Sequence, residues 1–147
     1  MVYIETTVLI IYTLARHSDK TRYPHVANLF QQIEAGEIVA LTSFYALHEV
    51  FIFALKNAPE ATIGQQAGKE ALLEILKTKI HLVPLPTREE RILRARTFSA
   101  LTDSSDLTHA ICASAANCEA IVSYDHHFDA IASILPRMLP EQLAAKE

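Results

Sequence analysis

The sequence predicts an α/β domain with a central parallel sheet and helices on both of its faces. Its 147 residues fit one domain spanning residues 1–147, and a composition that is 50% hydrophobic is sufficient for a buried core. Short β-rich segments alternate along the chain with segments that have the hydrophobic spacing of helices. This alternation is typical of βα units, which build parallel sheets.

The beginning of the chain is predicted to contain two strands with a helix between them. Val2–Ile4 is a short β-rich run, and Glu37–Leu41 is a second one. The helix is expected over residues 23–34, with Pro24 in its first turn and Gly36 at its end. Its apolar residues have the spacing of one helix face: Val26, Leu29, Phe30 and Ile33.

A pair of apolar helices is predicted to follow the second strand. The first begins at Thr42 or Ser43 and ends at the break Asn57–Pro59, and the second covers residues 60–78. A third strand, Ile80–Leu85, comes next. The two helices are more apolar than one face of a small core requires. An interface with another protein explains this, and burial under the domain's own loops is the alternative.

The last third of the chain is predicted to contain two helices, a strand and a short helix. One helix runs from Thr87 to about Ser99 and opens with a capping box, and Asp103 opens the next. Ala120–Ser123 has the composition of a buried strand, and Phe128–Leu135 is the short helix. The residues after it are left unassigned.

Composition and charge exclude several classes of binding protein. Three glycines are too few for a glycine-rich nucleotide loop. With 13 basic and 17 acidic residues, a nucleic-acid partner would have to be held by a local basic patch or by metal ions. Arg91 and Arg94 lie one helical turn apart and are candidates for phosphate contacts. The alternative is a solvated helix face on which Glu89 and Glu90 pair with them.

The sequence predicts a cytoplasmic protein without a membrane segment. Cys112 and Cys118 are too few for a disulfide scaffold and match no zinc-binding spacing. Glu5 interrupts the apolar first residues, which also lack the basic start of a signal peptide. No uncharged apolar run reaches the roughly 18 residues that a membrane span needs.

Four acidic side chains occupy positions that favour a common site. Glu5 directly follows the first strand, and Asp125 lies two residues after the fourth. Because the carboxyl ends of parallel strands meet at one edge of a sheet, these two are expected to lie close together. Glu49 interrupts an apolar helix, and Asp106 lies in the first turn of the helix that Asp103 opens. Taken singly, each is also explained as a loop acid, a helix cap or an exposed ion pair.

Clustered carboxylates need a cation, because they otherwise repel one another. Oxygen ligands with few imidazoles favour Mg²⁺ or Mn²⁺ over Zn²⁺. The chemistry that fits such a site is metal-assisted hydrolysis of phosphodiester bonds, with two ions about 4 Å apart. His126 and His127 follow Asp125 directly. We interpret them as exposed loop residues, with assistance to a metal as the alternative.

Four motifs resemble those of PIN-domain nucleases, and they occur in the family's order over nearly the whole chain. Tyr3–Leu9 resembles the opening strand that ends in Asp-Thr/Ser-Asn, and Thr42-Ser43 followed by Leu47–Val50 resembles the helix with a buried Glu. Ser105–Ala110 resembles the third acidic motif, and Ile121–Phe128 resembles the closing Thr-x-Asp-x-x-Phe motif. The size is also similar to that of VapC-type toxin ribonucleases of prokaryotic toxin–antitoxin pairs.

The resemblance implies a three-layer α/β/α fold and RNA cleavage that depends on Mg²⁺ or Mn²⁺. By motif position it implies a catalytic, metal-binding set of acids: Glu5, Glu49, Asp106 and Asp125. Thr6 and Ser123 would support ligands or water through their hydroxyl groups, and Asp103 would be an accessory ligand. A cognate antitoxin and a homodimer are the expected protein partners, with the apolar helix pair as a candidate interface.

Glu5 departs from the family pattern, which has Asp at this position. Glu keeps the charge but is one methylene longer, and a misplacement of about 1 Å can cost roughly 10²-fold in rate. A lower cleavage rate is therefore one expected consequence. Two alternatives to a nuclease remain open. One is a catalytically weakened PIN-like module that binds RNA or a protein partner without cleavage. The other is an unrelated α/β domain that binds a small molecule, which the missing glycine loops disfavour.

Overall fold

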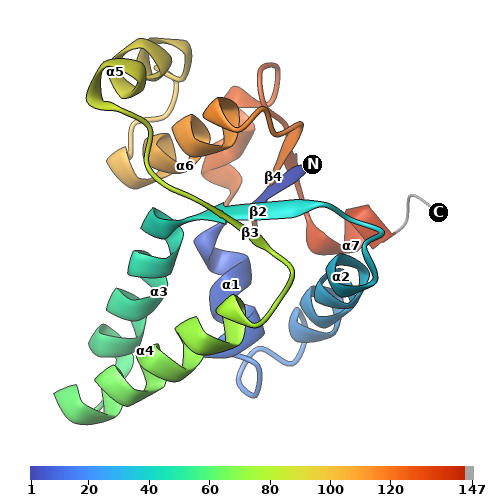
Figure 1. Ribbon diagram of the computed structural model, residues 1–147, viewed down its shortest axis with the longest axis vertical. Coiled ribbons are helices and arrows are strands. Elements are labelled where there is room, and N and C mark those ends of the chain that lie inside the picture. Colours follow the sequence, from blue (N-terminus) through green and yellow to red (C-terminus); the bar gives the residue numbers. More distant parts are fainter. Residues whose placement is uncertain (145–147) are drawn as a thin grey trace.

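The computed structural model describes residues 1–144 and has a central sheet covered by helices on both faces (Figure 1). The sheet has five strands in the order β3-β2-β1-β4-β5, and every neighbouring pair is parallel. The strands are β1 Val2–Ile4, β2 Ala40–Ser43, β3 His81–Val83, β4 Ala120–Val122 and β5 Arg137–Met138. The predicted parallel α/β fold is confirmed.

The helices form the two outer layers of the molecule. They are α1 Thr6–Thr13, α2 Tyr23–Ala35, α3 Phe44–Asn57, α4 Ala61–Leu76, α5 Arg88–Thr97, α6 Ser104–Ala115, the 3-10 helix η1 His126–Ile131, and α7 Pro140–Ala144. Helices α3 and α4 lie side by side at one end of the molecule, and α5 lies at the other (Figure 1). Within residues 1–144, no helix has both the length and the hydropathy of a membrane span.

Two hydrophobic cores lie on opposite sides of the sheet, and strand β1 contributes to both. Val2 and Ile4 belong to the core under α1, α2, α3 and α4. Tyr3 points to the other face and belongs to the core under α6 and η1. Because successive strand residues face opposite sides, a strand with three buried residues must be covered on both faces. The predicted three-layer α/β/α arrangement is therefore confirmed.

Local sequence signals set where several of the helices begin and end. The side chains of Ser43, Thr87 and Asp103 accept hydrogen bonds from backbone N–H groups in the first turns of α3, α5 and α6. Gly36 ends α2 in the left-handed conformation, with a φ of 80°. These four positions agree with the sequence prediction, and they fix how each helix leaves the sheet.

Some elements differ from the prediction. The sequence does not predict α1, because its apolar and β-branched residues lie on all sides of the helix and show no single face. Strand β2 begins three residues later than the predicted segment 37–41. The short helix predicted at 128–135 is η1, which begins and ends earlier. Strand β5 and α7 lie in the segment left unassigned, where the strand is only two residues long.

Close packing of α4 on α3 depends on two glycines. A Cβ atom on Gly68 would lie 2.6 Å from Cδ2 of Phe51, and one on Gly64 would lie 3.0 Å from the backbone oxygen of Ala54. A side chain at either position would have to displace α3 atoms. The apolar helix pair is thus held together by a glycine-lined contact.

We expect Gly68→Ala to lower the free energy of unfolding by about 1 kcal/mol. Overpacking against the Phe51 ring costs about 1–3 kcal/mol, and the better helix propensity of Ala returns about 1 kcal/mol. In a Phe51→Ala background the ring is absent, so the same substitution should stabilise. Urea denaturation of the four proteins of this cycle measures both values. An equal effect of Gly68→Ala in both backgrounds would contradict this explanation.

Candidate active site

The four predicted acidic side chains lie at the carboxyl edge of the sheet and come from four different places in the chain. Glu5 follows β1 and Asp125 follows β4, and these two strands are parallel neighbours. Glu49 lies on α3, and Asp106 lies in the first turn of α6. Because α3 and α6 pack in different cores, the edge is where the two helical layers meet.

The acidic side chains form two groups, and each group includes one histidine. The glutamate group consists of Glu5, Glu49 and His109, and the aspartate group consists of Asp106, Asp125 and His127. Within each group, one potential ligand atom from each residue lies within 4.8 Å of the others. Each group therefore has the composition and spacing of a cation site.

Glu5 is buried and its carboxylate is tightly held. Its Oε2 atom accepts hydrogen bonds from the backbone N–H of Thr7 at 3.0 Å, from Oγ1 of Thr7 at 2.5 Å and from Oγ of Ser123 at 2.8 Å. The other oxygen, Oε1, lies 3.8 Å from Nε2 of His109. One carboxylate oxygen is thus fixed by donors, and the other faces the interior of the glutamate group.

Glu49 is held by side chains from two other elements. Thr6 Oγ1 donates to its Oε1 at 2.7 Å, and Ser105 Oγ donates to its Oε2 at 2.6 Å. The imidazole of His109 also contacts Oε1. Burial opposes ionisation, but hydrogen bonds with His109, Ser105 and Thr6 lower the pKa of Glu49 to about 2. A charged carboxylate on an apolar helix is therefore explained by its partners.

In the aspartate group the pKa shift of the acid has the opposite direction: the pKa of Asp106 is raised, whereas that of Glu49 is lowered. His127 Nδ1 lies 3.2 Å from Oδ2 of Asp106 and 3.3 Å from Oδ1 of Asp125. Burial, together with the charges of Asp125 and Asp103, raises the pKa of Asp106 above its ordinary value, and His127 lowers it in part. The negative charge at this position is incompletely balanced by the protein itself.

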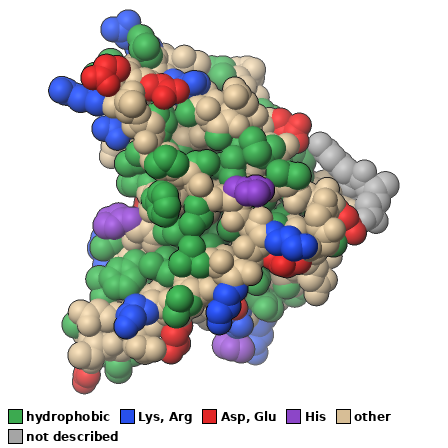
Figure 2. All heavy atoms as spheres, in the orientation of Figure 1, with side chains coloured by type: hydrophobic (Ala, Val, Ile, Leu, Met, Phe, Trp, Pro, Cys, Tyr) green, Lys and Arg blue, Asp and Glu red, His purple; other side chains and the backbone are tan. Residues whose placement is uncertain are grey.

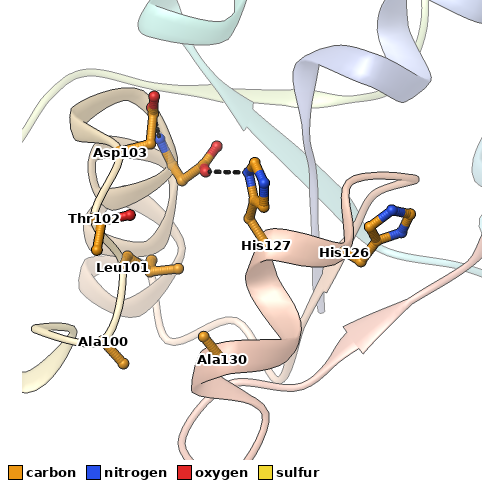
Figure 3. Close-up of a pocket in the computed structure, with 8 residues that line it drawn as sticks. Ala100, Leu101, Thr102, Asp103, His126, His127 and Ala130 are labelled. Atoms are coloured by element: carbon orange, nitrogen blue, oxygen red, sulfur yellow. Dashed lines mark hydrogen bonds and ion pairs between the residues drawn. The ribbon is translucent and has the colours of Figure 1, made fainter.

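A hollow of about 470 Å³ opens beside Asp106 and is drawn in Figure 3. Asp103 lies at the start of α6 on one side of it, and His126 and His127, the first two residues of η1, lie on the other. A second hollow of about 380 Å³ borders Thr6 and Glu49. The two hollows flank the carboxylates, so a ligand could approach both groups from solvent.

His109 belongs to the glutamate group, although its sequence motif gave it no predicted role. It lies one helical turn after Asp106 on α6, so this helix supplies one residue to each group. The signal in the sequence is Asp-x-x-His at a helix start, a spacing that puts both side chains on one face. Small and apolar residues around His109 make it resemble an ordinary core histidine instead.

The predicted accessory residues lie next to the acids. Thr6 donates to Glu49, and Ser123 donates to Glu5 while accepting from the backbone N–H of Asp125 at 2.9 Å. Asp103 caps α6 and lines the hollow beside Asp106, and it belongs to neither ligand group. Its role as an accessory ligand stays a prediction.

The arginines of helix α5 that were predicted to contact phosphates have partners within the chain. Arg94 pairs with Glu90 at 2.9 Å and donates to Ser114 Oγ at 2.8 Å, as the alternative of a paired helix face expects. Arg91 is partly buried, and its charge acts on the Cys112 thiol. The contact of Arg91 and Arg94 with RNA stays a prediction.

This fold and its acidic edge define an α/β/α domain with a candidate metal centre, and the sequence identifies the family. Residues 1–127 match the family described as PIN domain. The chain therefore belongs to the PIN domain family, as its four motifs predicted. No curated protein matches the sequence closely enough to be counted as a relative.

Solved structures of VapC proteins share the fold. VapC20 of Mycobacterium tuberculosis, described as a sarcin-ricin loop cleaving toxin, is 16% identical, with a TM-score of 0.63 over 88% of this chain and 94% of that one. VapBC2 from Rickettsia felis, bound to a DNA fragment from its promoter, is 19% identical, with a TM-score of 0.64 over 95% of this chain and 98% of that one. VapBC-1 from nontypeable Haemophilus influenzae is 16% identical, with a TM-score of 0.63 over 95% of this chain and 98% of that one.

The lowered pKa of Glu49 predicts a pH-dependent contribution to stability. Because the pKa of about 2 lies below the ordinary 4.5, ionised Glu49 stabilises the fold above pH 4.5, and this contribution is lost as the pH falls toward 2. In chelator, Glu49→Gln should therefore cost about 2–3 kcal/mol near neutral pH and progressively less in acid. Denaturant unfolding at several pH values measures the difference.

The control is the exposed Glu89→Gln, which should change stability by no more than about 0.5 kcal/mol. A Glu49→Gln penalty that stays constant from neutral pH to pH 3 would show that the carboxylate charge is not what stabilises the fold.

Proposed function

We propose that this protein is a metal-dependent endoribonuclease, the toxin of a toxin–antitoxin pair, which cleaves phosphodiester bonds in RNA. The observation that carries the proposal is the pair of carboxylate groups at one edge of a PIN-domain sheet. The fold shared with VapC20, whose description names sarcin-ricin loop cleavage, supports the same kind of activity. RNA is the proposed substrate, and the cytoplasm, where RNA is available, is the proposed location.

The donor atoms suit a hard divalent cation, which we propose to be Mg²⁺ or Mn²⁺. Each group offers two carboxylates, and the raised pKa of Asp106 reflects burial and like charges that a cation would offset. When bound, such an ion supplies positive charge and Lewis acidity to the phosphodiester and to the attacking water. In an acidic chain it also supplies the charge that attracts RNA.

The residues around the acids act by holding them in place. Thr7 and Ser123 fix one oxygen of Glu5, and Thr6 and Ser105 each bind one oxygen of Glu49. The side chain of Asp103 accepts hydrogen bonds from the backbone N–H groups of Ser105 and Asp106, which sets the start of α6 and thus the position of Asp106. Carboxylates that are oriented before the ligand arrives do not lose rotational freedom when it binds.

We propose the exposed apolar side chains of α3 and α4 as the contact surface for a cognate antitoxin. Figure 2 shows hydrophobic side chains gathered across the middle of one face, with charged ones over α5 at one end and over α4 at the other. The larger exposed members on the two helices are Phe44, Phe53, Ile63, Leu73 and Leu76. Monomers usually expose large apolar side chains singly, whereas these two helices expose five of them. The fold shared with the VapBC2 and VapBC-1 structures supports such a partner.

A homodimer is a second proposed assembly. Helix α5 has no buried residue, and it exposes Ile92 and Leu93, with Leu85 just before it. An apolar helix surface without a cover inside its own chain favours association with a second copy.

Asp106→Asn and Asp125→Asn should each lower RNA cleavage at least about 100-fold, because each removes a charge and a ligand atom. Cleavage of mixed-sequence single-stranded RNA should also require Mg²⁺ or Mn²⁺ and stop in chelator. The matched control is Asp129→Asn, which removes an exposed carboxylate close to Asp125 in sequence. Full cleavage by either site variant would refute the assigned role.

Glu5 distinguishes the nuclease from the alternative of a weakened PIN-like module that binds without cutting. If its longer side chain lowers the rate, Glu5→Asp should cleave as fast or faster, and Glu5→Gln should bind the metal more weakly. Metal titration and an RNA cleavage time course on the three proteins measure this. Equal binding and cleavage by all three would exclude Glu5 from the site. Binding of RNA by all three without any cleavage would favour the non-catalytic module.

A further inference from the structure

His109 is a fully buried imidazole between two carboxylates, and the proposed function gives it no role. Its Nε2 atom contacts Oε1 of Glu49 and lies 3.8 Å from Oε1 of Glu5. The same nitrogen is 3.2 Å from Oγ1 of Thr6. All its polar neighbours on this side belong to the glutamate group or support it.

The opposite ring nitrogen of His109 has a partner of its own. Nδ1 lies 2.7 Å from the hydroxyl of Tyr3, which lies 2.7 Å from Oγ of Ser43. All three side chains are buried. Without a cation, Nε2–H donates to the ionised Glu49 carboxylate, and Nδ1 accepts from the Tyr3 hydroxyl. Because the hydroxyls of Tyr3 and Ser43 can each donate or accept, Nδ1 can carry the ring proton instead when a cation takes the place of the proton on Nε2. Histidines that bind metals usually have their other nitrogen fixed in this manner.

Aromatic rings also restrict the orientation of His109. The ring of Tyr45 lies edge-on at a centroid distance of 5.2 Å, and that of Phe128 lies edge-on at 6.5 Å. A ring confined on both sides and hydrogen-bonded at Nδ1 presents Nε2 in one fixed direction. That direction is toward the carboxylates.

We propose that His109 is a nitrogen ligand of the cation held by Glu5 and Glu49, and that this position prefers Mn²⁺ to Mg²⁺. The inference rests on the proposed metal site and adds a ligand and a metal preference to it. Mg²⁺ is bound almost entirely through oxygen, whereas imidazole is a common ligand of first-row transition ions. Two carboxylates and one imidazole therefore favour the transition ion. Tyr3 and Ser43 are positioning residues for this ligand.

The direct test is pulsed electron paramagnetic resonance of Mn²⁺ bound to the full chain labelled with nitrogen-15 histidine. The experiment is done in the His127→Gln variant, because His127 is exposed and could itself supply a nitrogen. We expect a coupling between the bound Mn²⁺ and a histidine nitrogen. Bound Mn²⁺ without such a coupling would overturn the inference and leave the carboxylate site intact. Failure to bind any Mn²⁺ would overturn the inference and the proposed metal site together.

Binding titrations test the metal preference. His109→Gln should weaken Mn²⁺ binding at least about tenfold and change Mg²⁺ binding less, and Tyr3→Phe should have the same effect in smaller measure. Tyr3→Phe removes only a hydroxyl, so it tests the ligand even if His109→Gln fails to fold. His48→Gln is the matched control, because His48 is exposed beside the hollow that Glu49 borders. An unchanged ratio of Mn²⁺ to Mg²⁺ affinity in Tyr3→Phe, or tighter Mn²⁺ binding, would overturn the inference.

Discussion

Negative charge concentrated at the carboxyl edge of a parallel sheet is the constraint on which the rest of this structure depends. Glu5 and Asp125 reach that edge because they follow neighbouring parallel strands. Glu49 and Asp106 reach it because α3 starts directly after β2 and α6 is capped by Asp103. Such charges are costly to bury unless donors or cations balance them. The elements around the edge provide those donors.

The two groups differ in how many hydrogen-bond donors stabilise their buried negative charge. Hydroxyl donors and His109 surround the glutamate group, and Glu49 is strongly ionised as a result. The aspartate group has fewer donors, and Asp106 has a raised pKa. The protein thus offsets more of the negative charge with its own donors in the glutamate group than in the aspartate group. Each group offers carboxylates that suit a divalent cation, and the family to which the chain belongs supports phosphodiester cleavage as the function we propose.

The sequence was most informative where the signal is local. Strand ends predicted the positions of Glu5 and Asp125, a charge within an apolar helix singled out Glu49, and capping patterns located Asp103 and Asp106. These rest on spacing over a few residues, which a single chain reveals.

Features that depend on distant residues could not be predicted. His109 becomes part of the site only because Tyr3 and Glu49, far away in the sequence, pack against it. Helix α1 has no polar face because α2, α3 and α4 cover it, so its periodicity is hidden. The pairing of Arg94 with Ser114 likewise depends on how α5 packs on α6.

The most direct test of the metal site is anomalous X-ray diffraction from crystals of the protein grown with Mn²⁺. The measurement locates manganese independently of any cleavage assay. We predict manganese at the carboxyl edge of the sheet, coordinated by carboxylate oxygens of Glu5 and Glu49 or of Asp106 and Asp125. Manganese absent from that edge, in crystals that bind it at other carboxylates, would contradict the proposal that the four acids form a metal-dependent active site.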